Sequence, residues 1–448
     1  MITTDLFTKW LEQFINFERE PKKDLLNLEK MRFFANEFGE AHKTFKTIHV
    51  AGSKGKGSVS TMLSFCLTEA GFKTGLYTSP HVLDFRERVS LAGEFFSDVA
   101  YSKAYSEVMA VFENLLCKNP ELEPTWFEIV TCLSFVLFRN EKLDYAVYEV
   151  GMGGRLDTTN IISPEACAIM PIELEHCKYL GNTIEQIAFE KAGIIKPEIP
   201  VFCFEQEAEA LDVLKKTSSE KNARLFYMPK ILESIEKKVS LEGLNVKISY
   251  KAESEIGRLF SRPLSTKLKL LDEVQAKNAS LVVALLKYIL PKEMSEEVLE
   301  KGLSKTWLPG RFELMSKKPL VIIDGAHTIT SLKLSVSTFE KVVNKKAILL
   351  FACAEDKDME HIPSIFEKTF EKIYLTIPGL FKKSNLARLE KAFKNYYAGK
   401  NHKLEISTDY QAQIQKAYDE AKKLDMPLLI TGSFYLVGEA KGKLKFLE

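Results

Sequence analysis

The segment at residues 52–58, Gly-Ser-Lys-Gly-Lys-Gly-Ser, constrains the fold of this chain more than any other feature of its sequence. A β-rich run precedes it at Lys46–Ala51, and an apolar stripe at helical spacing begins at Ser58 and is ended by Gly71. Glycines let a backbone wrap around a phosphate, and the N-terminus of the following helix directs N–H groups and a positive dipole end toward it. The order of strand, glycine-rich turn and helix therefore predicts an α/β sheet with a phosphate-binding loop.

The spacing of this loop differs from the ordinary Walker A motif, G-x-x-x-x-G-K-[ST]. Counting back from Lys56, the first glycine of that motif would fall on Val50, and Gly57 separates Lys56 from Ser58. We interpret G-x-x-G-K-G-S as a variant loop in which Lys56 reaches the terminal phosphates and the Ser58 hydroxyl binds Mg²⁺. A glycine-rich turn that binds nothing is the alternative, and the flanking strand and helix favour phosphate binding.

A second candidate site residue is Glu149, which stands near the end of the apolar run Asp144–Val150. Ligands of open α/β sheets bind at the carboxyl ends of the strands, and a buried carboxylate is costly unless it meets a cation. With a phosphate loop on a neighbouring strand, we favour Mg²⁺ binding by Glu149 over a structural salt bridge, which stays the alternative.

Two further residues carry weaker signals. His176 follows a β-like run, and a lone histidine in that position is usually a satisfied loop or core residue. Residues 183–186, Thr-Ile-Glu-Gln, predict a capping box that opens a helix, and the apolar stripe of this helix continues onto Lys191. Such a lysine must extend to solvent, pair with a carboxylate such as Glu185 or Glu190, or lose its charge. A neutral lysine can also react with CO₂ and become a carbamate, a carboxylate-like metal ligand.

The chain as a whole alternates between strand and helix patterns, which is typical of a parallel sheet. Residues 200–270 differ, because they are lysine-rich with short alternating stretches, and we expect antiparallel strands there. The α/β alternation resumes after residue 306. We therefore expect two α/β domains, 1–306 and 307–448, with a cleft between them. In the second domain we expect strands at 320–323, 347–351, 372–375 and 428–431.

Composition excludes several classes of protein. The 448 residues include 62 Lys and Arg against 61 Asp and Glu, a net charge of +1 that argues against a nucleic-acid or membrane binder. The 7 cysteines are odd in number, form no C-x-x-C pair and mostly stand in apolar runs, which indicates buried free thiols in a reducing compartment. No signal peptide is visible, and no apolar run reaches the ~18 residues that span a bilayer. We therefore expect a cytoplasmic protein.

Taken together and in this order, these segments resemble the folylpolyglutamate synthase/dihydrofolate synthase family of the Mur ligase superfamily. The resemblance extends from about His49 to Tyr435. It implies an N-terminal P-loop ATPase-like domain, the Mur ligase central domain, which also carries the folate site, and a smaller C-terminal Rossmann-like domain. It further implies that a monomeric enzyme joins L-glutamate to a folate through an acyl phosphate, with ATP, two Mg²⁺ ions and K⁺ as cofactors. The acceptor that this resemblance implies is dihydropteroate, a reduced folate, or both, and no residue of the sequence selects among them.

The resemblance also assigns roles to individual residues. The phosphate loop comprises Gly52, Gly55, Lys56, Gly57 and Ser58. The metal ligands it implies are Ser58, Ser79, Glu149, His176 and a carbamylated Lys191, and the catalytic residues are Lys56, Glu149, His176 and Lys191. The further ATP contacts are Asn278, Arg311, Asp324 and His327, while Ser433 and Tyr435 match a C-terminal signature without an assigned role.

The sequence departs from the family pattern at positions peripheral to this chemistry. Ser53-Lys54 stands where Thr-Asn is usual, Thr328 replaces an asparagine, Val274 replaces a histidine and Glu175 replaces an aspartate. Peptidoglycan precursor ligases of the same superfamily are disfavoured, because they carry a further domain before the phosphate loop. A P-loop small-molecule kinase or NTPase is the alternative from a different class, although such a protein would not need a second domain bearing Arg311, Asp324 and His327.

Overall fold

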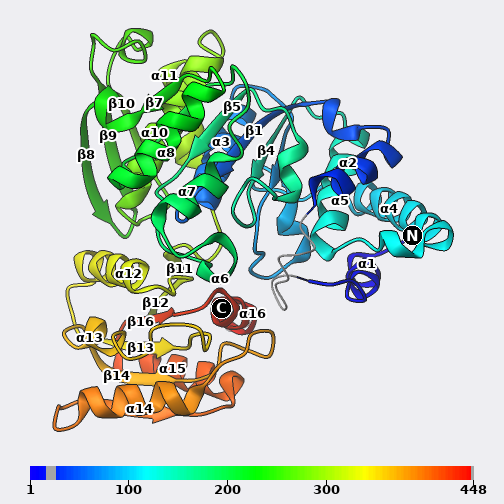
Figure 1. The fold of residues 1–448 in the computed structure, drawn as a ribbon. Helices are drawn as coiled ribbons and strands as arrows, with labels where there is room; N and C mark the ends of the chain where they lie inside the picture. The colour runs from blue at the N-terminus through cyan, green and yellow to red at the C-terminus, as the bar shows by residue number, and fades with distance from the viewer. Residues whose placement is uncertain (17–26, 445–448) are drawn as a thin grey trace. The chain divides into compact units, whose positions relative to one another are not determined.

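The computed structural model describes residues 1–16 and 27–444, and the chain forms two compact units (Figure 1). The first unit comprises Met1–Glu236, Val246–Lys267 and Ala276–Thr306. The second unit comprises Lys237–Asn245, Leu268–Gln275 and the chain from Trp307 onward. Two segments that precede residue 306 in the sequence therefore belong to the second unit.

A seven-stranded sheet with the order β3-β2-β4-β1-β5-β6-β7 organises the first unit. Its strands are β1 (Lys46–Ala51), β2 (Thr74–Tyr77), β3 (Val89–Leu91), β4 (Tyr145–Glu149), β5 (Ala166–Ile169), β6 (Val201–Cys203) and β7 (Leu225–Tyr227). All neighbours pair in parallel except β3, which runs antiparallel to β2. Strand β1 lies between β4 and β5, so the loop that follows β1 and the carboxylate that ends β4 come from adjacent strands.

Helices cover this sheet and enclose its core. They are α1 (Thr4–Leu11), α2 (Leu28–Glu37), α3 (Lys56–Glu69), α4 (Asp98–Lys118), α5 (Trp126–Asn140), α6 (Cys177–Leu180), α7 (Ile184–Ala192), α8 (Ala208–Glu220), α9 (Met228–Ile231), α10 (Val274–Ile289) and α11 (Glu296–Lys305). Aromatic side chains from α1, α2, α4 and α5 form one core cluster, and apolar side chains from β5, β6, α7 and α8 form another. Helix α3 is buried along most of its length, which fixes the loop at its N-terminus.

The prediction of antiparallel strands throughout residues 200–270 is wrong for its first part. Strands β6 and β7 continue the parallel sheet, because helix α8 connects them as a crossover, which a parallel pair requires. A separate three-stranded sheet follows, with the order β10-β9-β8. Its strands are β8 (Leu232–Ser240), β9 (Gly243–Tyr250) and β10 (Leu264–Leu268).

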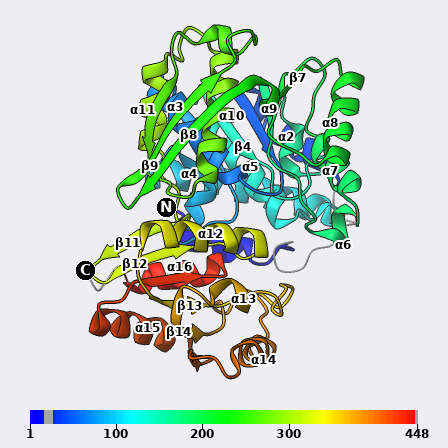
Figure 2. The same ribbon diagram turned by 90° about the vertical axis from the view of Figure 1, so that its left-hand side faces the viewer.

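The second unit contains a six-stranded sheet with the order β11-β12-β16-β13-β14-β15, and Figure 2 labels its strands β11, β12, β13 and β14. Its strands are β11 (Glu313–Lys317), β12 (Leu320–Asp324), β13 (Ala347–Phe351), β14 (Phe370–Leu375), β15 (Lys403–Ile406) and β16 (Leu428–Thr431). Its helices are α12 (Ile329–Val342), α13 (Pro363–Phe366), α14 (Leu386–Tyr397), α15 (Tyr410–Leu424) and α16 (Phe434–Leu444). The four expected strands are present, and β11 and β15 were not expected. Only β11 pairs antiparallel, with β12.

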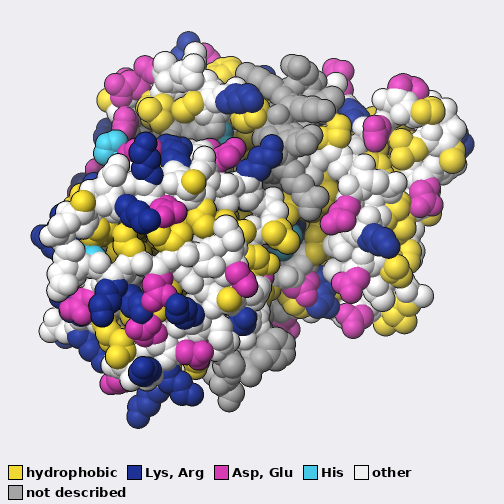
Figure 3. Space-filling view, turned by 90° about the horizontal axis from the view of Figure 1, so that it is seen from below, with side chains coloured by type: hydrophobic (Ala, Val, Ile, Leu, Met, Phe, Trp, Pro, Cys, Tyr) yellow, Lys and Arg dark blue, Asp and Glu magenta, His cyan; other side chains and the backbone are white. Residues whose placement is uncertain are grey.

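Three global features bear on the sequence analysis. In the described part of the chain, no helix combines the length and apolar character needed to cross a bilayer. All seven cysteines are free, and five of them are buried: Cys66, Cys132, Cys167, Cys203 and Cys353. Basic and acidic side chains are interspersed on the face shown in Figure 3.

Candidate active site

The phosphate loop joins the end of β1 to the start of α3. Gly52 has φ +137°, and a Cβ at this position would lie 2.6 Å from Cβ of Met170, so the loop can pass β5 only with glycine there. Gly55, with φ 85°, precedes the helix and provides no side-chain cap for it. Helix α3 begins at Lys56, two residues before the expected Ser58, so the N–H groups of its first turn belong to the loop itself.

Lys56 folds back over the loop. Its Nζ donates a hydrogen bond of 2.9 Å to the carbonyl oxygen of Gly52. This places an ammonium group at the N-terminus of α3, where the helix dipole also attracts anions. The local geometry is that of an anion-binding loop.

Glu149 lies against this loop from the adjacent strand. Its side chain is buried, with the residue 4% exposed, and its Oε2 accepts a hydrogen bond of 3.1 Å from the backbone N–H of Ser79. A Cβ placed on Gly57 would lie 3.5 Å from the same oxygen. The structure therefore brings together the Glu149 carboxylate, the residue before Ser58 and the backbone of Ser79.

These residues fit a magnesium ion. Carboxylate and hydroxyl oxygens are the ligands that Mg²⁺ prefers, and the ion usually completes its shell with water and substrate phosphates. Glu149 supplies the carboxylate, and Ser58 and Ser79 carry the hydroxyls. Among residues 1–16 and 27–444, no three His, Cys, Asp or Glu side chains gather as a metal site.

Sequence reasoning missed Asp157, which supports the loop after Glu149. Its Oδ2 accepts hydrogen bonds from the backbone N–H groups of Gly151 and Met152, at 3.0 and 3.1 Å, and its Oδ1 accepts from the Thr159 hydroxyl at 2.6 Å. Burial raises the pKa of Asp157, although these hydrogen bonds oppose the shift. An aspartate that precedes Thr-Thr after a glycine pair is a turn signal that could have identified it.

Lys191 reaches the loop from α7. Thr183 accepts the capping hydrogen bond from the N–H of Gln186, but the Gln186 side chain accepts from Asn182 instead of Thr183, so only half of the expected capping box forms. Lys191 is 1% exposed, and its Nζ donates to the carbonyl oxygen of Gly52 at 2.9 Å. The buried stripe on which the sequence analysis placed this lysine is therefore present.

The partner of Lys191 is Glu175, at 2.7 Å, and neither Glu185 nor Glu190. Burial lowers the pKa of Lys191 to about 8, while the Glu175 carboxylate opposes the shift. Burial would raise the pKa of Glu175, but the nearby ammonium groups of Lys191 and Lys56 lower it to about 2. The buried Lys191 ammonium and the partly buried Glu175 carboxylate therefore form an ion pair beside the phosphate loop. His176 follows Glu175 with φ 48° and is the N-cap residue that precedes α6.

Asn278 completes this group in the first unit. It lies on α10 and is 3% exposed, and its Oδ1 is 3.2 Å from the position that a Cβ on Gly55 would take. The helix that carries it thus contacts the phosphate loop directly.

The three remaining site candidates lie in the second unit, where Arg311 and His327 both contact the Phe434 ring. The guanidinium of Arg311 lies 4.4 Å from the centre of the Phe434 ring, and the His327 ring stands edge-on to it at 6.1 Å. Asp324 ends β12 and is buried, and burial raises its pKa to about 6 although Arg311 opposes the shift. A Cβ on Gly325 would lie 2.2 Å from the Phe434 ring, so this packing requires glycine.

Comparisons of this chain with known proteins show the family to which it belongs. The Mur ligase middle domain matches residues 50–286, and the Mur ligase glutamate ligase domain matches residues 310–434. A dihydrofolate synthase/folylpolyglutamate synthase from Bacillus subtilis is 30% identical over 444 residues, which cover 97% of this chain and 98% of that protein. The chain belongs to the folylpolyglutamate synthase/dihydrofolate synthase family of Mur ligases.

Other members of this family are similar over comparable lengths. The folylpolyglutamate synthase of Lacticaseibacillus casei is 28% identical over 413 residues, covering 90% of this chain and 91% of that protein. The crystal structure of folylpolyglutamate synthase from Thermotoga maritima aligns with a TM-score of 0.81 and 28% identity, covering 98% of this chain and 96% of that one. The folylpolyglutamate synthase of Mycobacterium tuberculosis complexed with ADP aligns with a TM-score of 0.85 and 25% identity, covering 97% and 96%. The predicted family and fold class are confirmed.

Proposed function

We propose that this folylpolyglutamate synthase family member joins L-glutamate to a folate by forming an amide bond, with ATP as the energy source. The observation that carries the proposal is the buried Glu149 carboxylate against a phosphate loop, in a chain that matches the Bacillus subtilis enzyme over nearly its whole length. The same site suits a folate or dihydropteroate as the acceptor, because both present a carboxylate.

The reaction begins with activation of the acceptor, because a carboxylate is a poor acylating agent. One oxygen of the folate carboxylate attacks the γ-phosphorus of ATP, ADP leaves, and an acyl phosphate forms. Lys56 and the N-terminus of α3 offset the charge on the transferring phosphoryl group. The glutamate amine then attacks the acyl carbon, the amine loses a proton, and phosphate leaves with the oxygen that came from the folate.

Glu149, Ser58 and Ser79 would hold a magnesium ion in this reaction. The ion, when bound, supplies positive charge to the phosphate oxygens. The role of the chain is to present three oxygen ligands beside the loop, with Glu149 fixed by the hydrogen bond from Ser79.

We further propose that Lys191 becomes carbamylated and, with His176, holds a second Mg²⁺. Its burial and its pKa of about 8 support this, because burial favours the neutral amine that attacks CO₂. The amine forms a C–N bond to CO₂ and releases a proton, so the product is a carboxylate-like group. Lys191 must then give up its ion pair with Glu175.

K⁺ binding, a monomeric state and a cytoplasmic location stay predictions.

In the second unit we propose Arg311, Asp324 and His327 as ATP contacts, with Asn278 from the first. Two observations, one in each unit, support this: Arg311 and His327 are held against the Phe434 ring, and Asn278 lies beside Gly55 of the phosphate loop. We also propose domain limits of 1–306 and 307–448, supported by the passage from the first to the second unit after Thr306.

Phosphate release tests the proposed function against the alternative of a P-loop kinase or NTPase. The purified protein is incubated with ATP and Mg²⁺ alone, with a folate, with glutamate, and with both. A ligase releases phosphate in quantity only when both substrates are present. Equal release in all four reactions would favour an NTPase.

A further inference from the structure

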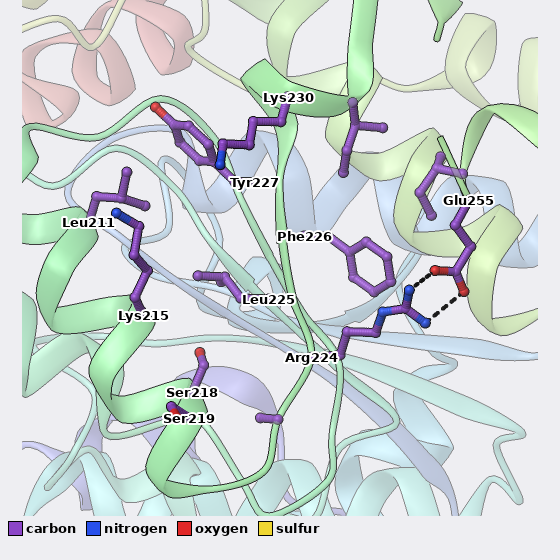
Figure 4. Close-up of a pocket in the computed structure, with 13 residues that line it drawn as sticks. Leu211, Lys215, Ser218, Ser219, Arg224, Leu225, Phe226, Tyr227, Lys230 and Glu255 are labelled. Atoms are coloured by element: carbon purple, nitrogen blue, oxygen red, sulfur yellow. Dashed lines mark hydrogen bonds and ion pairs between the residues drawn. The ribbon is translucent and has the colours of Figure 1, made fainter. Parts of the chain in front are cut away.

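A groove on the first unit lies along strand β7, and none of the site residues described above lines it. Its cavity volume is about 580 Å³. Helix α8 forms one wall, and α9 with residues 255–256 forms the other (Figure 4). In Figure 4, the Leu225 side chain points toward α8 and the Phe226 side chain toward the opposite wall, so the viewer looks onto the edge of the strand.

Strand β7 offers main-chain groups to this groove. It is the last strand of its sheet and pairs with β6, where the N–H of Val201 donates to the carbonyl oxygen of Arg224 at 2.8 Å. In a parallel pair, alternate residues turn both main-chain groups toward the neighbour. With Val201 in register with Leu225, Phe226 faces β6, so the N–H and C=O of Leu225 point outward. Within residues 1–16 and 27–444, no further strand pairs with β7 on that side.

The walls of the groove combine apolar surface with positive charge. Three cations, Lys215, Arg224 and Lys230, line it together with one carboxylate, Glu255. Arg224 pairs with Glu255 at 2.8 Å, and Lys215 pairs with Asp212, one turn earlier on α8, at 3.0 Å. Ser218 lines it as well; the residue is 2% exposed, and among residues 1–16 and 27–444 its hydroxyl has no hydrogen-bond partner. Buried hydroxyls are normally hydrogen-bonded, so Ser218 leaves an unsatisfied hydroxyl beside the groove.

We propose that this groove binds an extended, acidic peptide segment of a partner protein, which adds to β7 as an eighth strand. Outward main-chain groups on an edge strand are a template for such pairing, and the groove walls receive the alternate side chains. The excess of cations selects carboxylates on the peptide. A second copy of this chain is a poor occupant, because pairing two β7 edges would bring the lysines of both copies together.

Peptide binding tests the proposal on the full-length protein. The probe is a fluorescently labelled, end-capped peptide of alternating Glu and Val, and its matched control alternates Lys and Val. Fluorescence anisotropy should show saturable binding of the Glu–Val peptide that weakens with salt, and binding of the Lys–Val peptide should be at least about tenfold weaker.

Two pairs of variants locate the binding. Leu225→Pro removes the outward N–H and leaves the bonds between Phe226 and β6, since proline is tolerated on an edge strand where the N–H faces solvent. Leu225→Ala keeps the N–H and is the matched control. Lys215→Glu combined with Lys230→Glu reverses two wall charges, and Lys216→Glu, on an exposed neighbour that does not line the groove, is the control. Leu225→Pro and the double variant should each lose about tenfold or more in affinity, while both controls bind as the parent does.

Circular dichroism and ligase activity confirm that each variant folds, and the proposal does not depend on that activity. Bound peptide should also slow hydrogen exchange of the Leu225 amide. Four outcomes would overturn the proposal: no saturable binding at millimolar peptide, equal binding of both peptides, equal loss in Leu225→Ala and Leu225→Pro, or an unchanged exchange rate, which would indicate a small-anion site. Self-association that Leu225→Pro abolishes would assign the edge to a second copy instead and would also overturn it.

Discussion

The Nζ of Lys191 lies 2.7 Å from Oε1 of Glu175, and both groups are held beside the phosphate loop. This pair puts a buried ammonium where the family resemblance implies a carbamate. The pair and the carbamate are mutually exclusive states of one side chain, because the carbamate carries a negative charge that Glu175 would repel. Metal binding by His176 and the carbamate would favour the second state.

Lys191→Ala should be nearly inactive, and a short carboxylic acid such as acetate should partly restore its activity by filling the vacated ligand position. Lys56→Ala is the control for this rescue, because it lacks a different group and a carboxylate should not help it. Electron density that ends at the Nζ of Lys191 with metal and nucleotide bound, together with no rescue, would contradict carbamylation.

Lys56→Ala should lower turnover by at least ~10²-fold, the scale of a lost contact to charge that develops in the transition state. The fold should persist, because the Lys56 side chain is only partly buried and its hydrogen bond stays within the loop. Steady-state kinetics and thermal unfolding measure the two effects. Lys43→Ala, which removes an exposed lysine paired with Glu40, should change neither. Near-normal turnover of Lys56→Ala would show that the loop binds something other than the transferred phosphate.

Glu149→Gln keeps the shape of the side chain and removes its charge. Activity should collapse and should return only in part at high Mg²⁺, because the amide is a weaker ligand. Titration of activity with Mg²⁺ measures this, and Glu141→Gln, at a half-buried carboxylate paired with Lys73, should leave the titration unchanged. A Glu149→Gln variant that is less stable but fully active would assign Glu149 a structural role.

Asp324 makes the stability of the folded chain depend on pH. Its pKa is about 6 in the folded state and near 3.8 in the unfolded chain. As the pH rises from about 4 through about 6, the unfolded chain loses this proton before the folded chain does, so the free energy of unfolding falls. Asp324→Asn removes that loss. As the pH rises from about 4 to about 7.5, the free energy of unfolding of the variant should therefore increase by up to about 3 kcal/mol relative to that of the parent.

Urea unfolding at both pH values measures the gain from Asp324→Asn. Asp419→Asn, at an exposed carboxylate on α15, is the control. If the free energies of unfolding of the parent and Asp324→Asn differ by the same amount at about pH 4 and pH 7.5, then Asp324 titrates alike in the folded and unfolded states.

Local periodicity predicted the elements that surround the phosphate loop. Strand β1, the loop and helix α3 follow from a β-rich run, glycines and a helical stripe that are adjacent in sequence. The burial of Lys191 followed in the same way from its place on the stripe of α7.

Contacts between distant segments could not be read from the sequence. Glu175 stands in a loop without periodicity, so nothing identified it as the partner of Lys191. The approach of Asn278 to Gly55 joins residues more than 200 positions apart, and it depends on how α10 packs. The parallel pairing of β7 was missed because a strand of three residues between two helices carries too little pattern to show the direction of the strand.

Ligation through an acyl phosphate transfers one oxygen of the folate carboxylate to the released phosphate, so an oxygen isotope can follow the reaction. A folate acceptor carrying a heavy oxygen isotope in its reacting carboxylate is incubated with the protein, ATP, Mg²⁺ and glutamate, and the products are weighed by mass spectrometry. We expect a folate product heavier by one glutamyl residue and released phosphate that contains one heavy oxygen. Phosphate without the heavy isotope, or phosphate release with no glutamylated product, would contradict ligation through an acyl phosphate.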